Sequence, residues 1–278
     1  MSFQAVESWW FKVDFEFKEN YRISDLLQIM RILRGEGGCP WDREQTHQSI
    51  RRNFIEETYE VVEAIDNGDT ALLLEELGDV LLQVVFHTQM EAEQGAFSFD
   101  DVCDGICKKL ILRHPHIFGD VTAETPDEVL KNWDEIKKQE KGQKTQSDAV
   151  RSVPKTLPAL MRGAKVQQRA AKTGFDYPDL SDALGDLESE LAELKEAISG
   201  GDRAAVDEEF GDLLFSCVNV SRFLHLDAEE SLTRSTEKFI RRFSEVEKLA
   251  EQNGADMKTA SLDELNQLWA QAKKQVQS

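Results

Sequence analysis

One helical pattern occurs twice along this chain of 278 residues. Residues 54–86 read FIEETYEVVEAIDNGDTALLLEELGDVLLQVVF, and residues 187–220 repeat the order of their acidic and apolar positions as LESELAELKEAISGGDRAAVDEEFGDLLFSCVNV. Three further stretches match in the same order: LLQIMRILRGEGGCPWDREQT with LPALMRGAKVQQRAAKTGFDYPD, KLILR with KFIRR, and NWDEIKK with LWAQAKK. Four ordered matches predict two copies of one unit of about 120 residues.

Both copies have the periodicity of helices. Apolar residues recur at spacings of three and four in segments such as ISDLLQIMRIL and TPDEVLKNWDEIKKQE, whereas alternating strand patterns are nearly absent. The turn Asn67-Gly68-Asp69 and the pair Thr125-Pro126 are typical of helix boundaries. We therefore expect an all-α protein with an N-terminal extension (1–22), a first helical domain (23–138), a polar linker (139–155) and a second helical domain (156–278).

The charge balance restricts the partners. Lys and Arg number 33 against 53 Asp and Glu, a formal net charge of −20. We therefore expect no nucleic-acid partner and no membrane partner. The chain starts without the features of a signal peptide, its longest apolar run, VLLQVVF, is too short to span a bilayer, and its four cysteines lack C-x-x-C spacing. These features predict a soluble, cytoplasmic protein.

The first copy concentrates carboxylates without cations. No Lys or Arg occurs between Asn53 and Cys107, although like charges three or four residues apart repel each other on a helix. Four glutamates fall within about 120° of one helix face, and an acidic pair spaced by three residues follows on the next helix. These residues are Glu56, Glu57, Glu60 and Glu63, followed by Glu76 and Asp79.

The second copy repeats the acidic arrangement. A single run of glutamates is most simply a solvated stripe, but repetition, and the apolar helix that follows each E-x-x-D, favour carboxylates held against a helix bundle. Such carboxylates need a counter-ion. Because every donor is an oxygen and no His stands three residues after Glu60, Glu76, Glu193 or Glu209, we expect Mg²⁺, with Mn²⁺ as a substitute. The residues of the second copy are Glu190, Glu193, Glu209 and Asp212.

Basic and aromatic residues also recur in both copies. A lysine and an arginine four residues apart share a helix face, where they either hold a phosphate chain bridged to Mg²⁺ or form ordinary surface salt bridges. Trp133 and Trp269 each precede a Lys-Lys pair by four residues, and each either stacks on a base or fills a core or dimer interface. The basic residues are Lys109 and Arg113 in the first copy and Lys238, Arg241 and Arg242 in the second.

The sequence lacks the motifs of other nucleotide-binding and hydrolytic enzymes. Neither G-x-x-x-x-G-K-[ST] nor G-x-S-x-G occurs, so a P-loop enzyme and a serine hydrolase are excluded. Two alternatives to a metal-dependent nucleoside triphosphatase stay open. One is an acidic helical scaffold that binds a protein partner, and the other is a pyrophosphohydrolase of another diphosphate-containing nucleotide.

The motifs resemble those of two-domain MazG-type nucleoside triphosphate pyrophosphohydrolases. The family pattern E-E-x-x-E, a spacer and E-x-x-D is complete in the first copy, whereas Ser189 replaces the first glutamate in the second. The stretches GGCPWD (37–42) and RHPHIF (113–118) also look like family signatures. The resemblance extends from Ile23 to the C-terminus. It implies four-helix-bundle cores completed by dimerisation, and Mg²⁺-dependent hydrolysis of an NTP or dNTP to nucleoside monophosphate and pyrophosphate.

The same resemblance implies roles for individual residues. Metal-activated water would attack the α-phosphorus, with Glu57 and Glu190 as candidate acceptors of its proton. The acidic residues of each copy would bind Mg²⁺. The resemblance places the main activity in the C-terminal half, whereas the complete motif lies in the N-terminal half, so the division stays open. Substrate binding would fall to Asp186, Lys238, Arg241, Arg242 and Trp269 in the second half and to Lys109, Arg113 and Trp133 in the first.

Overall fold

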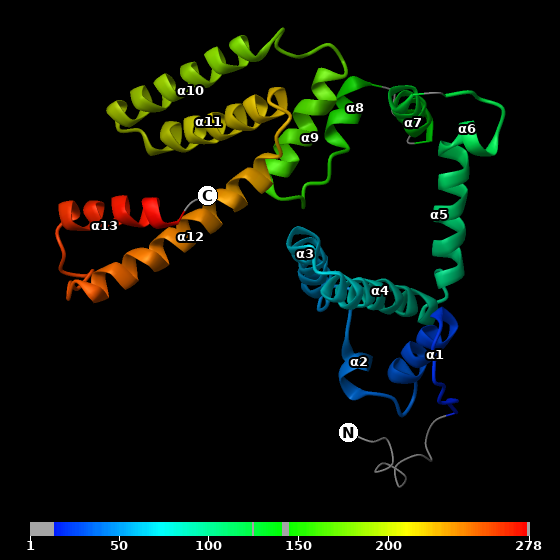
Figure 1. Ribbon diagram of the computed structural model, residues 1–278. Coiled ribbons are helices and arrows are strands. Elements are labelled where there is room, and N and C mark those ends of the chain that lie inside the picture. Colours follow the sequence, from blue (N-terminus) through cyan, green and yellow to red (C-terminus); the bar gives the residue numbers. More distant parts are fainter. Residues whose placement is uncertain (1–13, 124, 141–144, 277–278) are drawn as a thin grey trace. The chain divides into compact units, whose positions relative to one another are not determined.

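The computed structural model describes residues 14–123, 125–140 and 145–276, and within these ranges every regular element is a helix (Figure 1). The predicted all-α class is therefore confirmed. The chain divides into two compact units, residues 1–137 and 138–278. Residues 1–13 of the predicted N-terminal extension lie outside the described ranges. In the part of the chain that is described, no helix is both long enough and apolar enough to cross a membrane.

The first unit is built around a helical hairpin of α3 (Arg51–Asn67) and α4 (Thr70–Glu93). Gly68 ends α3 in the left-handed conformation, with φ of 64°, which glycine adopts without steric cost. The Asp69 side chain then accepts hydrogen bonds from two backbone N–H groups in the first turn of α4. This tight reversal brings the two acidic helix faces together. The unit also contains α1 (Ile23–Arg34), α2 (Pro40–Glu44), α5 (Phe99–Arg113), α6 (Pro115–Phe118) and all but the last turn of α7 (Pro126–Glu140).

The second unit repeats this hairpin with α10 (Leu180–Gly200) and α11 (Arg203–Phe223), which lie side by side in Figure 1. Gly201 has φ of 74°, and the Asp202 side chain accepts a hydrogen bond from the N–H of Ala204. The same left-handed glycine and aspartate cap thus fix both acidic hairpins. Helix α9 (Ala159–Ala171) packs on α11, and α12 (Ala228–Gln252) pairs with α13 (Leu262–Gln275).

Buried apolar side chains form two clusters, one in each unit. In the first unit the cluster joins α1 to α4, and in the second it joins α12 to α13, where Trp269 packs against it. Neither cluster includes the exposed apolar side chains of the two acidic hairpins, α3–α4 and α10–α11. The clusters consist of Met30, Ile50, Val85, Phe86 and Met90, and of Val246, Leu249, Ala250, Leu268 and Ala272.

Part of the segment that composition predicts as a linker is helical. Residues Gln146–Arg151 form α8, which begins with a capping box between Thr145 and Asp148 and packs on α9. The guanidinium group of Arg169 donates to the backbone carbonyl of Ala149, and Val153 is buried. The described residues from Thr145 onward in this segment therefore belong to the second unit.

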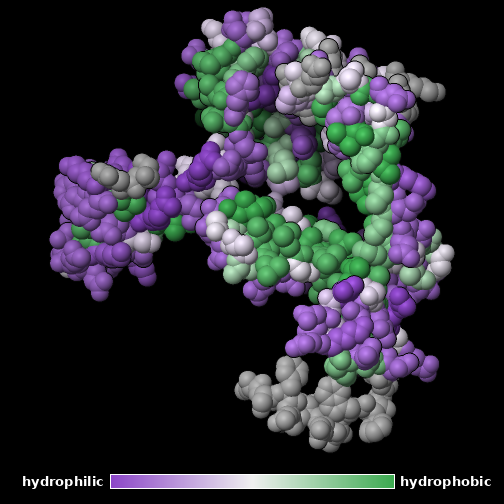
Figure 2. Space-filling view, turned by 45° about the vertical axis from the view of Figure 1, so that its right-hand side comes forward, coloured by the Kyte–Doolittle hydropathy of each residue, from purple (hydrophilic) through white to green (hydrophobic). Residues whose placement is uncertain are grey.

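Both acidic hairpins expose large apolar side chains. On α3 and α4, the exposed fractions are 58% for Ile65 and 78% for Leu74, and Figure 2 shows hydrophobic surface over this helix pair. On α10 and α11, they are 59% for Ile198 and 52% for Phe210. Apolar surface gathered in this way is typical of a face that binds another molecule.

Candidate active site

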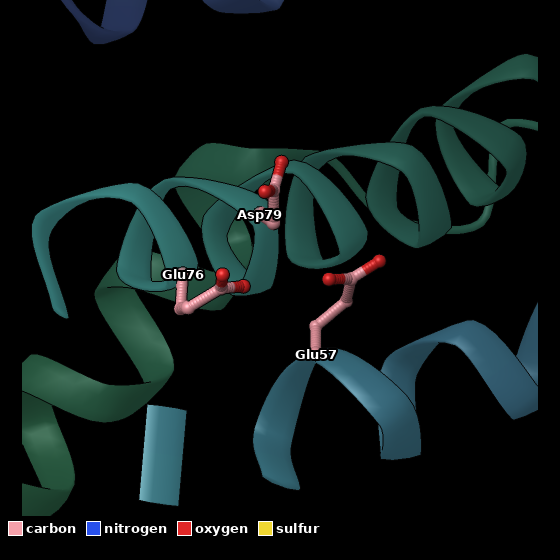
Figure 3. Close-up of side chains that lie close together, drawn as sticks. All are labelled: Glu57, Glu76 and Asp79. Carbon is pink, nitrogen blue, oxygen red and sulfur yellow. The ribbon is translucent and has the colours of Figure 1, made fainter. Parts of the chain in front are cut away.

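The first unit brings three predicted metal ligands together. Glu57 extends from α3 toward α4, and Glu76 and Asp79 extend from α4, so that the three side chains lie close together (Figure 3). One carboxylate oxygen from each residue lies within 4.8 Å of the other two. Glu76 is only 9% exposed. The arrangement is therefore a compact set of three oxygen donors supplied by two helices.

The second unit forms a matching set on its own hairpin. Glu190 and Glu193 extend from α10 and Glu209 from α11, again with one oxygen of each within 4.8 Å of the others. Asp212 lies outside this trio but close enough for its charge to act on Glu190 and Glu209. Ser189, which replaces a glutamate of the family pattern, donates a hydrogen bond of 2.9 Å to Glu193 and so helps to orient a member of the trio.

Protonation of the first cluster is favoured by its surroundings. Burial raises the pKa of Glu57, and a hydrogen bond with Glu60 and the charges of Asp79 and Glu76 raise it further. Burial also raises the pKa of Glu76, followed by the charges of Glu60 and Asp79. Every side chain that shifts these two values is another carboxyl group, so the cluster favours any change that lowers its negative charge.

The second cluster has the same electrostatic character. Burial raises the pKa of Glu190, and the charges of Glu193, Asp186, Asp212 and Glu209 add to the shift. Burial likewise raises the pKa of Glu209, with Glu193 as its strongest charged neighbour. A divalent cation would neutralise this repulsion, and an all-oxygen donor set suits Mg²⁺. The donors in both units therefore fit the predicted metal.

The remaining predicted ligands are placed differently. Glu60 lies beside the first cluster, as its effects on Glu57 and Glu76 indicate. Glu56, in contrast, forms an exposed ion pair of 2.9 Å with Arg52, one turn earlier on α3. Its carboxylate is thus engaged by a cation on the helix surface, whereas Glu57 points toward α4.

The basic and aromatic residues of the first unit form a cation–π group. The guanidinium carbon of Arg113 lies 5.2 Å from the centre of the Trp133 ring, and the Lys137 ammonium lies 5.3 Å from it. Trp133 is thus contacted by two cations. Lys109 is exposed on α5, one turn before Arg113.

In the second unit the corresponding residues lie on the hairpin of α12 and α13. The Trp269 ring is 5.3 Å from that of Phe239 and packs against the buried cluster, so it contributes to the core of this hairpin. Lys238 is half-buried and Arg241 is exposed. The Nε atom of Arg242 is buried and has no hydrogen-bond partner among the described residues.

Asp186 is held by contacts that the sequence alone did not reveal. Its carboxylate accepts a hydrogen bond of 2.7 Å from the Tyr177 hydroxyl and one of 2.6 Å from Ser216 on α11. The bond to Asp186, together with burial, raises the pKa of Tyr177 to about 12. Asp186 and Glu190 both border a cavity of 530 Å³ between α9, α10 and α11. Tyr177 lies in GFDYPD, inside the repeated stretch, but the repeat does not distinguish it as a functional residue.

Comparison with known proteins agrees with this architecture. The model of the MazG nucleotide pyrophosphohydrolase domain matches twice, at residues 45–118 and 181–246, and each match includes one carboxylate cluster. The chain is 45% identical over 249 residues to the nucleoside triphosphate pyrophosphohydrolase/pyrophosphatase MazG of Thermotoga maritima, covering 90% of this chain and 94% of the relative.

Two other relatives extend the comparison. The nucleoside triphosphate pyrophosphohydrolase of Escherichia coli K12 is 45% identical over 259 residues, 91% of this chain and 98% of the relative. The uncharacterised protein YabN of Bacillus subtilis is 46% identical over 91% of this chain, which corresponds to 52% of YabN. The predicted resemblance is therefore confirmed, and the chain is an enzyme of the MazG nucleotide pyrophosphohydrolase family.

Proposed function

We propose that this enzyme hydrolyses nucleoside triphosphates, NTP or dNTP, to nucleoside monophosphate and pyrophosphate with Mg²⁺ as its cofactor. The relatives from Thermotoga maritima and Escherichia coli carry this substrate class in their names. The observation that supports the metal is the pair of three-carboxylate clusters, in which burial and mutual repulsion raise the pKa of Glu57, Glu76, Glu190 and Glu209. Mn²⁺ is the expected substitute because it accepts the same oxygen donors.

In the proposed reaction a water molecule attacks the α-phosphorus, the bond from that phosphorus to the bridging oxygen breaks, and pyrophosphate leaves. When bound, Mg²⁺ would supply positive charge against the phosphates and acidify the water. Glu190 in the second unit, or Glu57 in the first, would accept the proton of the attacking water. Each belongs to one of the carboxylate trios, where a carboxylate that the metal does not fully engage can take that proton.

The cations on α12 would bind the phosphates in the second unit. The buried Nε–H of Arg242 has no partner among the described residues, and a phosphate oxygen would satisfy it. Lys238 and Arg241, on the same helix, would share this role. In the first unit Lys109 and Arg113 would do the same, with Trp133 holding the Arg113 guanidinium in place.

Product analysis tests this function. The purified protein is incubated with each NTP and dNTP plus Mg²⁺, and the products are separated by anion exchange. We expect nucleoside monophosphate and pyrophosphate in equal amounts. Nucleoside diphosphate with orthophosphate would contradict attack at the α-phosphorus. A folded protein without turnover of any nucleotide would favour the acidic scaffold instead.

We also propose that two copies associate through the apolar faces of the acidic hairpins and so complete four-helix cores. The exposed Leu74 and Ile198 support this, because a two-helix hairpin alone leaves such side chains in water. Light scattering after gel filtration is expected to give twice the chain mass of 31.6 kDa. The mass of a single chain at micromolar concentration would contradict the proposal.

We also propose that this enzyme has a reducing, cytoplasmic location. Cys39, Cys103, Cys107 and Cys217 are all free thiols in the described structure. Free thiols persist where the surroundings are reducing, which is typical of the cytoplasm.

A further inference from the structure

A cavity of 530 Å³ adjoins the carboxylate cluster of the second unit. Glu190 belongs both to its wall and to the cluster, and Asp186, one turn earlier on α10, also borders it. The volume falls within the range of about 300–1,000 Å³ that is typical of small-molecule sites. The cavity is thus large enough for a ligand part that continues from a phosphate chain held at the carboxylates.

One residue that lines the cavity carries a buried hydrogen-bond acceptor. Gln167 on α9 is 8% exposed, and its Nε2 group donates a bond of 2.7 Å to the backbone carbonyl of Phe215. This bond fixes the orientation of the amide, because only its nitrogen can donate to a carbonyl oxygen. The Oε1 atom of Gln167 is therefore the free end. It is buried and has no partner among the described residues, so an N–H group of a ligand would satisfy it.

Aromatic side chains form other parts of the wall. Phe215 and Tyr177 line the cavity, and Phe175 lines it while remaining 82% exposed. The segment that carries Phe175 and Tyr177 is fixed by a two-pronged pair between Asp176 and Arg222 on α11. Planar aromatic side chains near a polar acceptor are suited to a flat heterocycle with N–H groups.

The first unit is built differently at the matching position. Aligning Glu76-x-x-Asp79 with Glu209-x-x-Asp212 places Phe86 opposite Asn219. Asn219 lines the cavity of the second unit. Phe86 is instead buried in the core of the first unit, beside Trp41 and the guanidinium group of Arg34. The first unit thus places an apolar ring where the second has a polar side chain at a cavity.

We propose that this cavity receives the base of the nucleoside triphosphate and that Gln167 is a specificity-determining residue, whose Oε1 atom accepts a hydrogen bond from an N–H group of the base. The proposal rests on the proposed function, and it assigns base recognition to the second unit. Phosphates at Glu190 and Glu209 and a base beside Gln167 then place the nucleotide along one side of α10.

The test compares a nucleotide with its base-free counterpart. The value of kcat/KM is measured for ATP and for ribose 5′-triphosphate in the wild type, in Gln167→Met and in Gln168→Met. Gln168 is the exposed neighbour on α9 and serves as the matched control. Loss of one neutral hydrogen bond predicts a decrease of about five- to ten-fold for ATP in Gln167→Met. Ribose 5′-triphosphate is expected to react at an unchanged rate, and Gln168→Met is expected to match the wild type on both substrates.

Gln167→Met also removes the hydrogen bond from Gln167 to Phe215, which holds α9 against α11. A second variant therefore tests the cavity without that loss. Ala170→Phe fills the cavity from α9 without removing a hydrogen bond, and it should lower kcat/KM for ATP but not for ribose 5′-triphosphate. Melting temperatures verify that each variant is folded. Equal losses on the two substrates, or no loss on ATP in either folded variant, would overturn the proposal. Absence of NTP turnover in the wild type would instead overturn the proposed function, and this inference with it.

Discussion

Replacing Glu209 by Gln is expected to lower kcat for ATP by about 10²–10³-fold. Glu209 is the carboxylate that α11 contributes to a trio otherwise supplied by α10, so its amide would leave the trio with carboxylates from one helix only. The variant should still fold. Gln has nearly the same shape, and it removes a negative charge from a group whose pKa burial and Glu193 already raise. The expected result is therefore a folded, inactive enzyme.

Two further variants show whether the loss of activity is specific to Glu209 and which unit carries the activity. Glu208→Gln removes the neighbouring exposed charge and is expected to keep wild-type turnover, which controls for general loss of negative charge. Glu76→Gln makes the matching change in the first unit. Steady-state kinetics with saturating Mg²⁺ would measure all three. Loss in Glu76→Gln alone would move catalysis to the first unit, and full activity in both cluster variants would contradict a catalytic role for either trio.

The acidic hairpins could be predicted from sequence because local patterns determine them. Helical spacing places Glu190 and Glu193 on one face, and the same turn with glycine and aspartate follows in both copies, so a short reversal had to bring the E-x-x-D of the next helix close. Periodicity was too coarse for single residues. It places Glu56 on the acid face but does not show that its carboxylate pairs with Arg52, one turn away.

The contacts around the cavity could not be predicted in this way. Asp186 and Ser216 are joined across two helices, and a polar residue on an amphipathic helix has the same local pattern whether it meets water or another helix. Gln167 is an example, since only the packing of α9 on α11 buries it. Helix α8 could not be predicted either, for a related reason. Its polar composition is typical of a linker, and its stability comes from a capping box and from contact with α9.

Removing divalent cations is expected to abolish turnover, and added Mg²⁺ is expected to restore it. Both trios consist of carboxylates whose charges repel each other, and every donor is an oxygen, so a divalent cation would stabilise the arrangement and would bind the phosphates as well. The decrease in activity with excess EDTA should exceed about 10²-fold. EDTA that is already saturated with Mg²⁺ serves as the control, because it contains the chelator but cannot remove metal from the protein.

A readout independent of activity separates a bound cofactor from a metal that only accompanies the substrate. A ligand that binds only the folded state raises the melting temperature with its concentration. Mg²⁺ without nucleotide should therefore raise the melting temperature of the wild type, and it should do so less in Glu209→Gln, which has lost a donor. Undiminished turnover in EDTA would overturn the metal mechanism. Lost turnover without any Mg²⁺-dependent stabilisation would mean that the cation arrives with the triphosphate, because the carboxylates alone would then be too weak a site to hold it.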